Sequence, residues 1–105
     1  MISSSTHLVQ ILLPKETQGR PIGKEWFDRF LEELTGKFGG ATSFLRSPRQ
    51  GLWQSGGATQ KDRIAVVEVM VERLDHAFWR SLREKLEREL CQDEIVIRAQ
   101  EIRRL

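Results

Sequence analysis

The chain lacks several features that would narrow its function at once. Its single cysteine, Cys91, excludes an internal disulfide framework. No apolar run approaches the roughly 20 residues that span a bilayer, and residues 1–13 lack the basic start and long apolar stretch of a signal peptide. The formal net charge of +2 is too small by itself to imply an obligate nucleic-acid partner. We therefore expect a cytoplasmic protein with no membrane segment.

Glycine and proline are absent from residue 58 to the end of the sequence. All 8 glycines and 3 prolines lie between Pro14 and Gly57. The second half should therefore be almost continuous regular structure with short connections. In the first half we expect irregular loops over 14–23, 36–41 and 47–57, and the last of these is either a loop or a bulged strand. Loops on a rigid scaffold are a common place for function.

The hydrophobic pattern contains two copies of one unit, and each unit consists of a strand, an amphipathic helix and a second strand. Its predicted strands cover 7–14, 42–54, 63–72 and 94–101, and its predicted helices cover 24–38 and 75–91. At 105 residues the chain has room for one core, so we expect one domain over 1–105 with residues 1–6 as a frayed N-terminus. The order predicts an α+β, ferredoxin-like βαββαβ fold. Its four-stranded antiparallel sheet has the order 4-1-3-2 and carries two helices on one face.

Side chains alternate between the two faces of each predicted strand. One set is purely apolar and should lie beneath the helices: Val9, Ile11, Leu13, Ala65, Val67, Val69, Val71, Ile95, Ile97 and Ala99. The other set should line the open face, where Gln10, Glu68 and Arg98 form a polar row across neighbouring strands. Apolar residues surround that row: Leu8, Leu12, Ile64, Val66, Met70 and Val96. An exposed face of this composition typically marks a partner, a ligand or a second copy of the chain.

Glu68 is the titratable residue with the most unusual predicted surroundings. Burial among aliphatic side chains disfavours a carboxylate unless Arg98 or Gln10 compensates. Three interpretations follow: an ion pair with Arg98 within the chain or across a dimer interface, a general acid or base in a pocket, or simple exposure near an edge. The ion pair is favoured, so no catalytic residue is assigned and Glu68 is the only candidate. A pocket at this place would be lined by Gln10, Trp53, Glu68 and Arg98.

A basic segment connects the two halves of the chain. It carries Arg46, Arg49, Lys61 and Arg63, with Trp53 among them. Such a segment could hold an anion or stack on a nucleic-acid base. However, RNA-binding domains of this fold use aromatic side chains on the central strands, and those positions are aliphatic here. Nucleic acid is therefore the less favoured partner.

Other reactive residues show no pattern that binds a metal or cofactor. His7 and His76 have no companion at ligand spacing. Cys91 lies at a predicted helix C-terminus, where the helix dipole disfavours a thiolate, so we expect it to be inert packing. We expect no cofactor and no metal site.

Three short stretches accompany the element order: Glu25-Trp26-Phe27, Phe38-Gly39-Gly40-Ala41-Thr42 and Gly51-Leu52-Trp53. With that order, the chain resembles in general form the dimeric α/β barrel superfamily, and also small uncharacterised bacterial proteins that share its fold. The resemblance implies pairing of two open sheet faces and a possible ligand pocket, but no particular reaction.

The sequence does not identify an activity, a substrate or a pathway. The favoured interpretation is a small binding or interaction module that forms a homodimer through its open sheet face. The first alternative is a cofactor-free enzyme or small-ligand binder with a pocket near Glu68. The second is a weak anion or nucleic-acid binder that uses the basic segment from Arg46 to Arg63.

Overall fold

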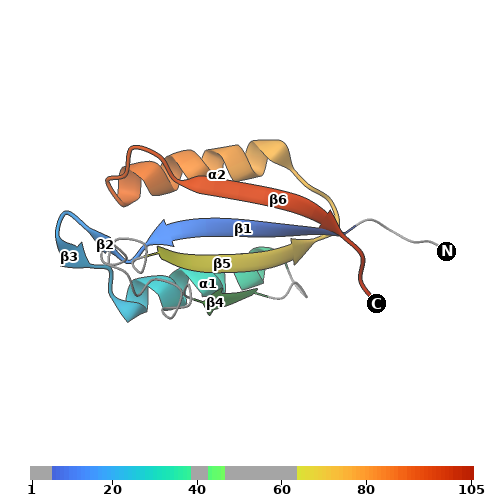
Figure 1. Ribbon diagram of the computed structural model, residues 1–105, viewed down its shortest axis with the longest axis horizontal. Coiled ribbons are helices and arrows are strands. Elements are labelled where there is room, and N and C mark those ends of the chain that lie inside the picture. Colours follow the sequence, from blue (N-terminus) through green and yellow to red (C-terminus); the bar gives the residue numbers. More distant parts are fainter. Residues whose placement is uncertain (1–5, 39–42, 47–63) are drawn as a thin grey trace, which may run out of the picture.

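A sheet and two helices form two layers in the computed structural model, which describes residues 6–38, 43–46 and 64–105. The sheet contains β1 (Thr6–Pro14), β4 (Ser43–Arg46), β5 (Ile64–Val71) and β6 (Val96–Ile102) in the spatial order β4-β5-β1-β6 (Figure 1). Each neighbouring pair is antiparallel. The predicted α+β architecture with two helices and an antiparallel sheet is confirmed. The end of the predicted second strand, residues 47–54, lies outside the described residues.

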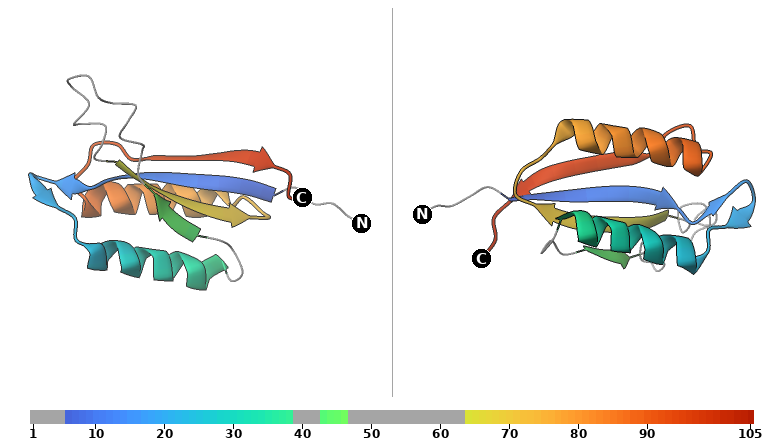
Figure 2. Two further views of the ribbon diagram at one scale, coloured as in Figure 1. Left: turned by 60° about the horizontal axis from the view of Figure 1, so that its bottom comes forward. Right: turned by 180° about the vertical axis from the view of Figure 1, so that it is seen from behind.

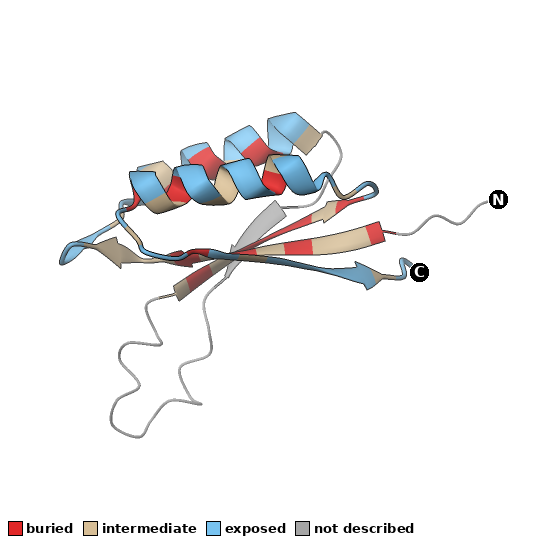
Figure 3. Ribbon diagram, turned by 90° about the horizontal axis from the view of Figure 1, so that it is seen from above, coloured by how far each residue is buried: buried red, intermediate tan, exposed pale blue. Residues whose placement is uncertain are grey.

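Both helices cover the same face of the sheet (Figures 2 and 3). Helix α1 (Lys24–Phe38) buries Phe27, Phe30 and Leu34 at intervals of three and four residues, which is the apolar stripe that the sequence predicts. Helix α2 spans His76–Glu89. Asp75 precedes it as the N-cap, where its Oδ1 accepts a hydrogen bond from the backbone N–H of Phe78 at 3.1 Å.

The core lies between the helices and the apolar face of the sheet. Val9, Ile11 and Leu13 of β1 and Val67 and Val69 of β5 are completely buried. Ile95 is also buried, but Ile97 is half-buried and Ala99 is exposed. The prediction that all the alternate residues of β6 are buried beneath a helix is therefore wrong for Ala99, which lies on an edge strand and borders a hollow between α2 and β6.

The segment after β1 is more regular than predicted. Residues 14–23, expected as an irregular loop, contain a small hairpin of β2 (Glu16–Thr17) and β3 (Arg20–Pro21). Gln18 and Gly19 connect its strands with φ values of 53° and 79°. A two-residue turn with two left-handed residues is the I′ type, whose twist matches an antiparallel hairpin. The Thr17 hydroxyl donates a hydrogen bond of 2.6 Å to the carbonyl oxygen of Leu90, so the hairpin is attached to the end of α2.

Helix α2 ends in a Schellman motif whose left-handed residue is not glycine. The N–H of Cys91 donates to the Arg88 carbonyl and the N–H of Gln92 donates to the Glu87 carbonyl, at 3.3 and 2.9 Å. Cys91 occupies the left-handed position with a φ of 56° and is exposed. Our prediction that Cys91 packs in the interior is wrong, because this helix terminus turns at its position and directs it to the surface.

The start of the described chain is ordered into the sheet. Thr6, which we placed in a frayed terminus, is the first residue of β1 and is 5% exposed. β1 begins and β6 ends at the same end of the sheet, where Thr6 pairs with Ile102. Within the described ranges, neither α1 nor α2 is long and apolar enough to cross a bilayer.

Candidate functional site

The open face of the sheet carries a hydrogen-bonded polar row across three strands. Gln10 lies between Glu68 of β5 and Arg98 of β6 in the strand register. Its Nε2 donates to Glu68 Oε2 at 2.6 Å, and its Oε1 accepts from Arg98 Nε at 2.8 Å. Alternation along the strands therefore brings together three of the four residues that the sequence predicted around a pocket.

Gln10 links the two charged groups of this row. Glu68 is only 4% exposed, whereas Arg98 is exposed. A buried carboxylate is costly unless hydrogen-bond donors satisfy it, and the Gln10 amide supplies one such donor. The ion pair expected between Glu68 and Arg98 stays a prediction, and what the structure shows is Gln10 hydrogen-bonded to both side chains. A side chain held in this way fixes the orientation of the row.

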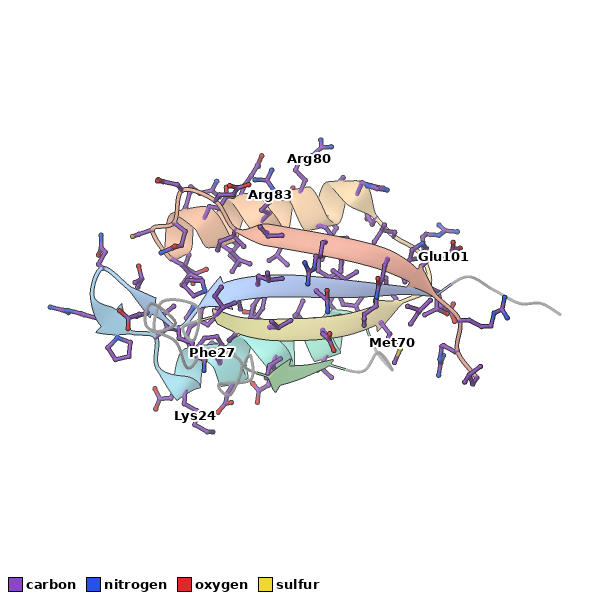
Figure 4. The ribbon with its side chains drawn as sticks, viewed as in Figure 1. Lys24, Phe27, Met70, Arg80, Arg83 and Glu101 are labelled. Atoms are coloured by element: carbon purple, nitrogen blue, oxygen red, sulfur yellow. The ribbon has the colours of Figure 1, made fainter. Side chains whose placement is uncertain are left out.

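Apolar side chains surround the row on the same face. Five of them are half-buried, and Val96 is 42% exposed. The half-buried five are Leu8, Leu12, Ile64, Val66 and Met70. Met70 projects near the end of β5 (Figure 4). This face is therefore mixed in character, with a polar centre, an apolar surround and its most exposed apolar member on the edge strand β6.

The remaining predicted site residues are not placed at this row. Trp53, Arg49, Lys61 and Arg63 lie outside the described residues. Arg46 ends β4, where its backbone is opposite Val66 of β5. A site formed by the basic segment stays a prediction.

A second candidate site lies on the other side of the sheet, and the sequence analysis missed it. It is a hollow of about 340 Å³ between α2 and residues 97–99 of β6, bounded by Val9 and Leu74 as well. Three α2 residues with basic side chains line it: His76, Arg80 and Arg83. Their spacing of four and three residues places them on one helix face, which is the sequence signal that could have indicated the site.

Arg83 is anchored at the edge of this hollow. Its Nη1 lies 3.0 Å from Glu87 Oε2, and the same carboxylate oxygen accepts a hydrogen bond of 2.9 Å from the backbone N–H of Ile95. The bond from the Ile95 N–H, followed by the nearby Arg83 guanidinium, lowers the pKa of Glu87 below its ordinary value. Glu87 thus fixes both the start of β6 and one wall of the hollow.

A smaller hollow of about 100 Å³ separates α1 from α2. Trp26 and Glu89 line it, and Trp26 Nε1 donates to Glu89 Oε2 at 3.3 Å. Trp26 also stacks on Phe30 with ring centroids 5.2 Å apart. Its polar atom is thus used in holding the two helices together.

Metal ligation has no candidate set in the part of the chain that the structure describes, since no three His, Cys, Asp or Glu side chains gather there. A comparison of the chain with models of known protein families finds no match, and a search of curated proteins finds no relative. The function must therefore be argued from the two sites themselves.

Proposed function

We propose that this chain is a non-catalytic interaction module that forms a homodimer by pairing the open sheet faces of two copies. The observation that carries the proposal is the Glu68–Gln10–Arg98 row, which is polar at the centre of an apolar face and ends in an exposed cation. In such a pair the apolar side chains would supply affinity by their burial, and the charged and hydrogen-bonding groups of the row would fix the register.

The charge order of the row supports a second copy as the partner. Glu68 stands at one end on β5 and Arg98 at the other on β6, with Gln10 between them. A twofold axis parallel to β1 and passing over Gln10 reverses the row in the second copy. Each Arg98 then lies opposite the Glu68 end of the other row, so charges of opposite sign approach one another.

The wider assignment belongs to the same proposal. The strand order β4-β5-β1-β6 supports a ferredoxin-like class with the order 4-1-3-2. Face-to-face pairing of such sheets would give the dimeric α/β barrel form that the sequence resembles. No observation on Glu68 favours an enzyme over this module, because its carboxylate is held by Gln10.

The experiment is the molar mass in solution of the protein and two lysine variants, measured by light scattering at tens of micromolar. The wild type should have twice the 12.2 kDa chain mass. Val96→Lys places a charge on the proposed interface at an exposed site and should give a monomer with unchanged thermal stability. Ser81→Lys, on the exposed surface of α2, is the matched control and should stay dimeric.

A monomeric wild type would overturn the dimer proposal. A dimer that Val96→Lys leaves intact would show that another surface pairs. Glu68→Gln gives an independent measurement, since loss of its charge should weaken the dimer if the rows face one another.

A further inference from the structure

The hollow between α2 and β6 has the size of a small-molecule site, and its lining combines apolar and basic side chains. Its volume of about 340 Å³ falls within the range of about 300–1,000 Å³ that such sites occupy. Val9, Ile97 and Ala99 of the sheet contribute its floor, and Leu74 and Trp79 contribute its apolar wall.

The hollow lies where burial decreases along β6. Ile95 is 2% exposed, Ile97 is half-buried and Ala99 is exposed, although all three are on the helix-side face. The methyl group of Ala99 fills little of the space where a larger residue would reach α2. The chain therefore leaves apolar surface uncovered beside its edge strand.

The rim of the hollow on α2 is basic. His76, Arg80 and Arg83 share one face of the helix, and the first turn of α2 carries no acidic residue. Figure 4 shows Arg80 and Arg83 projecting from α2 and Glu101 standing apart at the far end of β6. Arg83 is paired with Glu87, whereas no described residue forms an ion pair with Arg80. A free guanidinium next to an apolar hollow suits a carboxylate or phosphate.

Trp79 adds an independent observation. The residue is 6% exposed and lines the hollow, yet its buried Nε1 has no hydrogen-bond partner in residues 6–38, 43–46 and 64–105. A buried indole N–H ordinarily has an acceptor, and leaving it unpaired is costly. An oxygen atom of a bound molecule would supply that acceptor.

The geometry points to a binding site for a small organic anion with a short apolar body. Its acidic group binds Arg80 and Arg83, and its body lies against Leu74, Ile97 and Ala99. The Trp79 indole N–H donates to one of its oxygen atoms. Helix α2 and the sheet floor place this site on the helix side, and Arg98 of the open-face row also reaches its lining.

Octanoate is a suitable probe, and the indole N–H of Trp79 is a built-in reporter in a ¹H–¹⁵N spectrum. The chain has 3 tryptophans, and the spectrum of Trp79→Phe identifies the signal of Trp79 by its loss. Octanoate should shift that signal to saturation and leave the Trp26 signal unchanged. Octylamine, with the same tail and the opposite charge, should not.

Three variants separate the site from general attraction to a basic protein. Arg80→Gln should raise the dissociation constant roughly tenfold, because it removes a charge-assisted hydrogen bond. Arg88→Gln makes the same change at the other end of α2 and should alter it less than about twofold. Ala99→Leu should block octanoate by filling the hollow while keeping both arginines.

The proposal is overturned if octanoate leaves the Trp79 signal unmoved at millimolar concentration. Equal shifts with octylamine, or equal losses in Arg80→Gln and Arg88→Gln, would also overturn it. Thermal unfolding of each variant checks that it is folded. Because all these readouts are made on the helix side, their failure and the failure of dimerisation are distinguishable.

Discussion

At its C-terminal end α2 is tied to three other segments by hydrogen bonds, whereas along its N-terminal half it borders a hollow. Thr17 of β2 donates to the Leu90 carbonyl, Trp26 of α1 to Glu89, and the N–H of Ile95 to Glu87. The N-terminal end is capped by Asp75. We call the C-terminal end of α2, which these hydrogen bonds hold, the closed end, and its N-terminal half beside the hollow the open end.

The comparison between the two ends of α2 indicates how a small domain places stabilising contacts and binding surface in different regions. Leu86 and Leu90 at the closed end are 1% and 3% exposed, so that end contributes apolar burial as well as hydrogen bonds. At the open end Arg80 is exposed, and the Trp79 N–H has no hydrogen-bond partner among the described residues. Binding surfaces are commonly found where a fold leaves contacts unmade, because those contacts are then available to a ligand.

The largest expected effect comes from a cavity at the closed end. Leu86→Ala removes most of a fully packed side chain and should lower the free energy of unfolding by about 2–5 kcal/mol, measured by urea denaturation. Arg80→Ala at the open end is the control and should change it by less than about 0.5 kcal/mol. Equal losses from both variants would mean that the two ends do not differ as described.

Much of this architecture follows from local sequence pattern. The alternation that places Ile11 and Val67 under the helices also places Gln10 and Glu68 on the opposite face, so the core and the polar row were both predictable. The prediction succeeded because side-chain direction in a strand has a fixed period of two residues.

The features that the sequence analysis missed depend on geometry that the local sequence pattern does not encode. The hairpin was missed because Gln18-Gly19 is a weaker turn signal than Asn-Gly. The hollow was missed because Ala99 has the apolar character of a core residue, and its exposure depends on the course of α2 above it. The left-handed Cys91 was missed because a glycine-free half of the chain gives no residue that marks a helix end.

A smaller effect, which stabilises the protein, should come from relieving backbone strain at the closed end of α2. The backbone of residue 91 has a φ of 56°, and Cys91→Gly introduces glycine, which adopts such a value freely. The free energy of unfolding should rise by about 0.5–1 kcal/mol after the greater entropy of glycine in the unfolded chain is counted. Cys91→Ala, which keeps a Cβ, is the matched control in reducing buffer. If alanine stabilises as much as glycine, loss of the thiol and not backbone relief is responsible.

The smallest expected effect concerns acid stability and tests what closes the end of α2. The pKa of Glu87 is lowered in the folded protein, chiefly by the bond from the Ile95 N–H and then by Arg83. Its charge therefore stabilises the fold above the ordinary pKa of glutamate, and this contribution is lost as the pH falls through the lower folded value. Glu87→Gln retains an acceptor for the Ile95 N–H but does not titrate, so its stability should fall less steeply in acid than that of the wild type. Urea denaturation at a series of acidic pH values measures the slope, with Glu84→Gln, an exposed glutamate of the same helix, as the control. Parallel acid slopes for wild type and Glu87→Gln would show that the carboxylate's charge does not hold this end closed.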